Sequence, residues 1–164
     1  MSQPQYPSQQ EYPPQQQTWQ GEPPLWAPYY GASFPVAVKR VFKKYATFSG
    51  RASRSEYWWW TLASVAVTIV LNIIMGAGAT SSSVSGSATA GPGAMIGMIL
   101  LVIWGLGTLV PSIALTVRRL HDVNFSGLLL LLILVPFLGA LAVLVFSLLP
   151  ANPAGQRFDQ PTSH

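Results

Sequence analysis

The stretch Arg118-Arg119-Leu120-His121-Asp122-Val123-Asn124-Phe125-Ser126-Gly127 is a polar segment between two apolar runs, residues 95–117 and 128–149. Four of its ten residues are titratable, whereas only 9% of the whole chain is charged. A membrane-spanning helix needs about 20 apolar residues, because each adds roughly 1.5 Å toward a hydrocarbon core about 30 Å thick. Both runs reach this length, so the polar segment is predicted to lie at a membrane surface.

A third apolar run covers residues 57–75, and the three runs together predict an all-α membrane protein with three transmembrane helices. Buried helices of a soluble domain are the alternative, but they would need polar faces at helical spacing. Ser147 is the only polar side chain between residues 128 and 149. Membrane spans are therefore the preferred interpretation.

Residues 1–35 form a Pro/Gln-rich tail with almost no aliphatic side chains. Proline removes backbone donors, and no apolar periodicity offsets the entropy of ordering, so the tail is predicted to be disordered. We interpret it as a solvated cytoplasmic tether, with a docking role for its aromatic residues as the alternative. The chain contains no cysteine, which excludes disulfide bonds and thiolate chemistry.

The membrane domain, residues 36–160, is predicted to begin with a short amphipathic helix over residues 36–48 that lies flat on the bilayer. Apolar side chains fall on one face of this helix, and the other face carries Lys39, Arg40, Lys43 and Lys44. Each basic residue near an anionic leaflet contributes on the order of 1 kcal/mol, so these four are expected to anchor the helix to lipid headgroups. Nucleic-acid binding is a weaker alternative, because the opposite face is apolar.

Ser53-Arg54-Ser55-Glu56 has the spacing of a capping box and directly precedes the first apolar run. Ser53 and Glu56 are expected to bond the free amides that open the helix, and Glu56 is also expected to pair with Arg51 or Arg54. Aromatic residues follow at once, and indole rings favour headgroup depth; the predicted interfacial anchors are Trp58, Trp59 and Trp60.

Small and polar residues recur every three or four positions along two of the apolar runs. The first stripe contains Ser64, Thr68, Asn72 and Gly76, and the second contains Gly105, Thr108, Ser112 and Thr116. Such stripes allow close approach of helices in lipid, so an antiparallel pair is predicted. A polar pathway for a solute is the alternative. Pro111 removes one backbone bond and predicts a kink near Gly107.

Within the polar segment, Arg118 and Arg119 are spaced to pair with Asp122 on a continuing helix. Asn124 or Ser126 is expected to cap the next helix, with Gly127 allowing the chain to turn. His121 and Asp122 could suggest a metal or a general base. The only other histidine is His164 and cysteine is absent, so we expect no metal, no cofactor and no catalytic site.

The placement of positive charge predicts the threading. Of nine basic residues, six lie between positions 39 and 54 and two are Arg118 and Arg119, whereas residues 76–93 have none. Two spans separate the clusters, so both are expected on the cytoplasmic side, together with the N-terminus. A third span would carry the C-terminus outward and leave Arg157 on the wrong side. Pro136 and Gly139 interrupt that run, so a re-entrant hairpin is the alternative.

Two motifs resemble those of the bacterial inner-membrane proteins grouped as domain of unknown function 805. They are Phe48-Ser49-Gly50-Arg51-Ala52-Ser53-Arg54-Ser55-Glu56-Tyr57-Trp58 and Arg118-Arg119-Leu120-His121-Asp122, the latter followed by Ser126-Gly127. The resemblance covers about residues 36–160 and implies a multi-pass protein of the bacterial inner membrane. Leu128-Leu129 and the ending Gln156-Arg157-Phe158-Asp159 depart from the family pattern, so the resemblance implies no role for that ending.

The preferred functional hypothesis is a non-enzymatic scaffold that binds lipid headgroups or a membrane-protein partner, including a second copy, at its cytoplasmic face. The candidate interaction cluster is Arg51, Arg54, Glu56, Arg118, Arg119, His121, Asp122, Asn124, Ser126 and Gly127. A small oligomeric transporter or channel is the alternative, although no charged residue lies deep within a span. An enzyme acting at the headgroup surface is third, since it would rest only on His121 and Asp122.

Overall fold

The computed structural model describes residues 21–80, 91–135 and 137–159, and throughout these ranges the regular secondary structure is helical. The expected all-α architecture is therefore confirmed for the part described. In chain order the elements are α1 (Phe34–Lys43), α2 (Arg54–Thr80), α3 (Pro92–Asp122), η2 (Gly127–Leu134), α4 (Leu138–Leu148) and η3 (Pro153–Phe158). Most of the predicted N-terminal tail, residues 1–20, lies outside the described residues.

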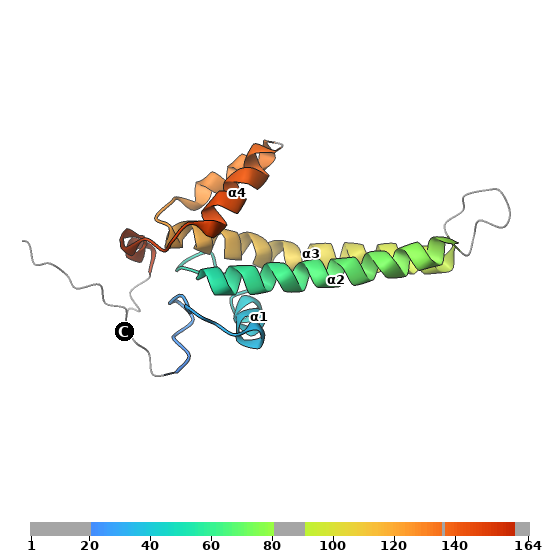
Figure 1. The fold of residues 1–164 in the computed structure, drawn as a ribbon, viewed down its shortest axis with the longest axis horizontal. Helices are drawn as coiled ribbons and strands as arrows, with labels where there is room; N and C mark the ends of the chain where they lie inside the picture. The colour runs from blue at the N-terminus through green and yellow to red at the C-terminus, as the bar shows by residue number, and fades with distance from the viewer. Residues whose placement is uncertain (1–20, 81–90, 136, 160–164) are drawn as a thin grey trace, which may run out of the picture.

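Helices α2 and α3 form a long antiparallel pair (Figure 1). Both Arg54–Gly78 and Pro92–Asp122 are long and apolar enough to cross a membrane. Their outer surfaces are aliphatic and exposed, with side chains such as Ile73 and Leu106 more than half accessible. A continuous apolar surface of this kind suits lipid contact far better than water.

The predicted antiparallel pairing is confirmed, but the predicted stripes supply only part of the contacts that hold it. Ser112 of the second stripe accepts a hydrogen bond from Trp60 of α2. A Cβ on Gly97 would lie 2.6 Å from the Cα of Met75, so the backbones approach closely there. Gly76 and Gly105, by contrast, face open space. Thr108 and Thr116 donate to carbonyls of their own helix, as polar side chains in apolar helices often do.

Pro111 lies inside α3 without ending it. Its ring nitrogen cannot donate to the carbonyl of Gly107, one turn earlier. The Tyr45 hydroxyl donates to this carbonyl instead, at 2.7 Å. A side chain from the segment after α1 thus satisfies the backbone group that the proline leaves free.

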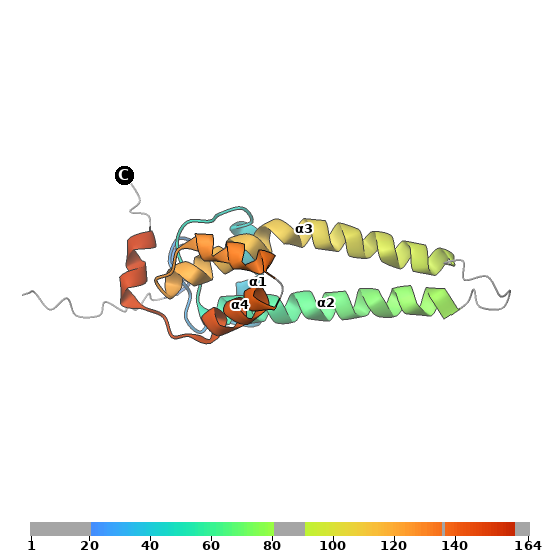
Figure 2. The same ribbon diagram turned by 90° about the horizontal axis from the view of Figure 1, so that it is seen from above.

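The third apolar run does not form one continuous helix, so the prediction of a single helix over residues 128–149 is corrected. It folds into η2 and α4, which pack against each other as a hairpin (Figure 2). Position 136 lies outside the described residues, but Phe137 has a positive φ of 65°. Gly139 packs against the backbone of Ile133, where a Cβ would collide with the opposite arm. A hairpin is the alternative that the sequence predicted for this run.

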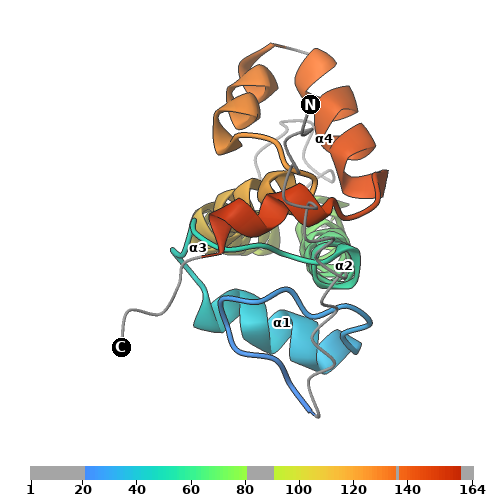
Figure 3. The same ribbon diagram turned by 90° about the vertical axis from the view of Figure 1, so that its left-hand side faces the viewer.

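Both arms of the hairpin connect to the same end of the α2–α3 pair. This polar end comprises α1, residues 44–56, residues 118–126 and residues 149–159. Helix α1 lies on one side of the pair and the hairpin on the other, with η3 crossing the end (Figure 3). The buried core at this end contains Val41, Ala52, Trp60 and Leu115.

Candidate interaction site at the polar end

The start of α2 has the predicted capping box. The Ser53 hydroxyl accepts from the Glu56 amide at 3.2 Å, and a Glu56 carboxylate oxygen accepts from the Ser53 amide at 3.0 Å. Two backbone donors that the helix cannot satisfy are thereby bonded reciprocally. This local prediction is confirmed.

The partner of Glu56 differs from the expectation. Its carboxylate binds Arg40 at 2.7 Å, rather than Arg51 or Arg54. Arg40 is 1% exposed and also donates to the carbonyls of Pro23, Pro24 and Ala27. Its expected role as a lipid anchor is therefore corrected, because this guanidinium ties the N-terminal segment to the start of α2.

Lys44 is the second basic residue of the predicted interfacial helix that is buried instead, with 4% of its surface exposed. Burial lowers the pKa of its amine to about 7, against the opposing attraction of Glu56. Lys39 and Lys43 are exposed, as the amphipathic pattern predicts. The pattern identified the helix but not which basic side chains fold inward.

Asp122 is the centre of a second buried network. Its carboxylate accepts from Arg119, as the three-residue spacing predicts, and from the Tyr30 hydroxyl at 2.8 Å. Arg51 lies 3.7 Å from Asp122 and binds Asp159 through two nitrogens, the closer pair at 2.7 Å. Burial and the adjacent carboxylate raise the pKa of Tyr30 above its ordinary value, so its phenol stays a donor.

Arg118 does not form the expected pair with Asp122. Its Nε donates to the Ala114 carbonyl at 3.2 Å, and its buried Nη2 has no partner among the described residues. Arg54 is exposed and donates through Nε to the Leu149 carbonyl at 2.8 Å. Arg119 also donates to the Leu149 carbonyl.

His121 packs against the C-terminal segment. Its ring stacks on Phe158 with centroids 4.1 Å apart, and its Nδ1 lies 3.2 Å from the Gly50 carbonyl. Within the described ranges, no three His, Asp or Glu side chains gather where they could hold a metal ion. His121 thus connects the end of α3 to η3 and to the segment that precedes α2.

The remaining residues of the polar segment shape the turn into the hairpin. The Ser126 hydroxyl accepts from the Leu128 amide at 3.3 Å, so Ser126 is the cap, and Asn124 has a positive φ of 65°. Gly127 has no positive φ, and a Cβ there would lie 2.7 Å from the Cγ1 methyl of Val117, so the glycine favours close packing on α3 rather than a turn.

The three tryptophans have different environments. Trp58 and Trp59 are exposed, as interfacial anchors would be, and Trp59 also donates to the Ala32 carbonyl. Trp60 is buried and donates to the Ser112 hydroxyl on α3 at 3.0 Å. Its predicted role as an interfacial anchor is therefore corrected, because it cross-links the helix pair.

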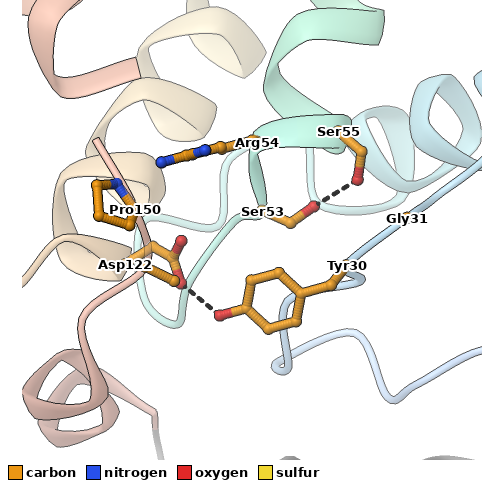
Figure 4. Close-up of a pocket in the computed structure, with 8 residues that line it drawn as sticks. Tyr30, Gly31, Ser53, Arg54, Ser55, Asp122 and Pro150 are labelled. Carbon is orange, nitrogen blue, oxygen red and sulfur yellow. Dashed lines mark hydrogen bonds between the residues drawn. The ribbon is translucent and has the colours of Figure 1, made fainter. Parts of the chain in front are cut away.

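A cleft of about 350 Å³ opens between these networks (Figure 4). Its walls include Tyr30 from the N-terminal segment, Ser53, Arg54 and Ser55 at the start of α2, Asp122 at the end of α3, and Pro150 after α4. Segments that are far apart in the sequence thus converge on one opening at the polar end.

Comparison with known proteins gives the family. Residues 45–160 match a family model described as a protein of unknown function, DUF805. This chain belongs to that family. An inner membrane protein of Escherichia coli K12, YhaI, is 35% identical over 121 residues, which are 72% of this chain and 87% of YhaI. The inner membrane protein YhaH of the same strain is 34% identical over 119 residues, covering 73% and 89% of the two chains. No solved structure matches.

The DUF805 match contains Arg51, Glu56, Asp122 and Asp159 but begins after α1. The N-terminal segment and Arg40 therefore pack onto the family region from outside the matched range. The buried cation that pairs with Glu56 is thus Arg40, which lies outside the matched range.

Sequence reasoning missed Tyr30, Phe158 and Asp159. Phe158 and Asp159 belong to the ending Gln156-Arg157-Phe158-Asp159, for which the family resemblance implied no role. Asp159 is one of only five acidic residues in the chain, and this scarcity was the available indication that it has an ion-pair partner. No feature of the sequence distinguished Tyr30, because it is one of several aromatic residues in a Pro-rich segment.

Proposed function

We propose that this chain is an integral protein of the bacterial inner membrane whose polar end faces the cytoplasm. The observation that carries this proposal is the distribution of basic residues. All nine lie in α1, residues 44–54, residues 118–119 or residue 157, which belong to the polar end. Inner-membrane proteins retain such clusters on the cytoplasmic side, and the names of YhaI and YhaH agree with the location.

Two crossings and a re-entrant hairpin fit this placement better than three crossings. The segment after α4 is bound back to the polar end, since the Asn152 amide donates to the Asp122 carbonyl at 2.8 Å and Asp159 pairs with Arg51. A third crossing would have to break these bonds. With the hairpin, Arg157 joins the other cations instead of opposing the charge rule.

The proposed molecular role is a non-enzymatic scaffold. Three buried guanidiniums, those of Arg40, Arg51 and Arg119, pair with carboxylates of the chain itself. They therefore stabilise the polar end and are not available to bind a partner. The exposed cations are Lys39, Lys43, Arg54 and Arg157. These exposed charges at the polar end suit the recognition of an anionic surface or partner at the membrane.

Single cysteines test the threading, because the chain has none of its own. Gln20→Cys, Ser85→Cys and Gln156→Cys are introduced separately and labelled with a membrane-impermeant maleimide. We expect position 85 to react in intact cells and positions 20 and 156 to react only after the inner membrane is opened. Labelling of position 156 from outside would restore three crossings, and labelling of position 20 would overturn the proposal.

A further inference from the structure

The cleft at the start of α2 has unused hydrogen-bond donors. Arg54 reaches from the helix start across the opening toward Pro150 (Figure 4). Its Nε binds the Leu149 carbonyl, but its terminal nitrogens have no partner among the described residues. A guanidinium with free terminal donors presents the planar fork that binds phosphate oxygens.

Backbone donors add to this guanidinium. The amides of Glu56 and Tyr57 are bonded to Ser53, whereas those of Arg54 and Ser55 have no partner in the described part of the chain. The N-terminus of a 27-residue helix carries partial positive charge, so free amides there favour an anion.

The one carboxylate in the cleft does not cancel this preference. Asp122 is already paired with Arg119 and Arg51, and it accepts from Tyr30. The guanidiniums of Arg51 and Arg119 pair with the carboxylates of Asp122 and Asp159. Arg54, which lines the same cleft, forms no ion pair with a described residue, so its positive charge is left over. The buried Nε of Arg119 also lacks a partner among the described residues.

The position of the cleft indicates that the anion is a lipid headgroup. Arg54 is the first residue of α2, and the exposed Trp58 and Trp59 follow about one turn later. In the proposed threading this places the cleft at headgroup depth in the cytoplasmic leaflet. A volume of about 350 Å³ lies at the small end of ligand pockets and suits a phosphodiester headgroup.

We propose that this cleft binds the phosphate of an anionic glycerophospholipid of the cytoplasmic leaflet, with Arg54 and the first amides of α2 as donors. The inference rests on the proposed function, because it needs the polar end at the inner leaflet. It assigns the lipid contact to one guanidinium rather than to the whole basic surface.

Titration calorimetry on the full chain in non-ionic detergent tests the site. The probes are dihexanoyl phosphatidylglycerol, dihexanoyl phosphatidylcholine and inorganic phosphate, with both lipids below their micellar concentrations. We expect phosphatidylglycerol to bind most tightly and Arg54→Gln to weaken it about tenfold or more, as for the loss of a charge-assisted hydrogen bond. Ala151→Trp, which fills the cleft without changing charge, should have the same effect.

Arg157→Gln is the matched control, since Arg157 is an exposed cation that does not line the cleft. Its binding should equal that of the unmodified chain. Equal weakening by both arginine variants, unchanged binding in Arg54→Gln, or binding of inorganic phosphate alone would each overturn the proposal. If the cysteines still place the polar end inside, such a result rejects the lipid site and leaves the threading intact.

Discussion

Arg40 and Glu56 show how a charged pair persists in a buried position. The guanidinium binds the carboxylates of Glu56 and Glu22 and three backbone carbonyls, so nearly every donor is used. Removing one partner of such a pair costs about 3–5 kcal/mol, because the other charge stays buried alone. The pair therefore fixes where the N-terminal segment lies, although replacing both partners by apolar residues need not destabilise the fold.

Lys44 gives the protein a pH-dependent stability. The pKa of its amine is about 7 in the folded chain and 10.5 in the unfolded chain. Between these values the unfolded state binds the extra proton, so the free energy of unfolding rises with pH. We expect the melting temperature in detergent to increase from pH 7 to about 9.5 and Lys44→Met to remove most of this increase.

Lys43→Met is the control for this prediction, because Lys43 is the exposed neighbour in sequence. It should retain the rise in melting temperature. Persistence of the same rise in Lys44→Met would show that another group titrates.

At the scale of elements, the α2–α3 pair depends on close backbone approach at one glycine. A Cβ at Gly97 would lie 2.6 Å from the Cα of Met75, so backbone and not a flexible side chain must move. We expect Gly97→Ala to destabilise the pair by about 1–3 kcal/mol, seen as a lower melting temperature in detergent.

Gly105→Ala provides the matched comparison in the same helix. Nothing lies within 4 Å of its added Cβ, and alanine favours a helix over glycine by about 1 kcal/mol. This variant should be neutral or stabilising. Equal loss of stability in both variants would mean that Gly97 does not set the helix spacing.

Across the whole molecule, the Arg51–Asp159 pair joins residues 108 positions apart and holds the C-terminal segment on the polar end. Asp159→Asn removes the charge from this nearly buried pair, which contributes about 1.5–3 kcal/mol as a charge-assisted bond. We expect faster tryptic cleavage after Arg157, by about tenfold. Gln156→Ala, an exposed neighbour, should leave the rate unchanged, and a similar rate in Asp159→Asn would show that other contacts hold the segment.

Local patterns in the sequence determined much of this protein. The length of the apolar runs predicts α2 and α3, and the Ser53–Glu56 spacing predicts the cap of α2. The positions of the basic residues predict that they gather at one end of the helix pair. Each of these properties depends on residues within a few turns of one another, or on a simple count. They are therefore visible before any tertiary contact is known.

Only the tertiary structure decided how the polar end is assembled. It paired Glu56 with Arg40 and Arg51 with Asp159, buried Lys44, and folded the third apolar run into a hairpin. Several guanidiniums and carboxylates lie in compatible sequence positions, and their charges alone do not distinguish one partner from another. The choice follows from which segments pack together, since a buried charge is stable only beside a partner that the whole fold brings to it.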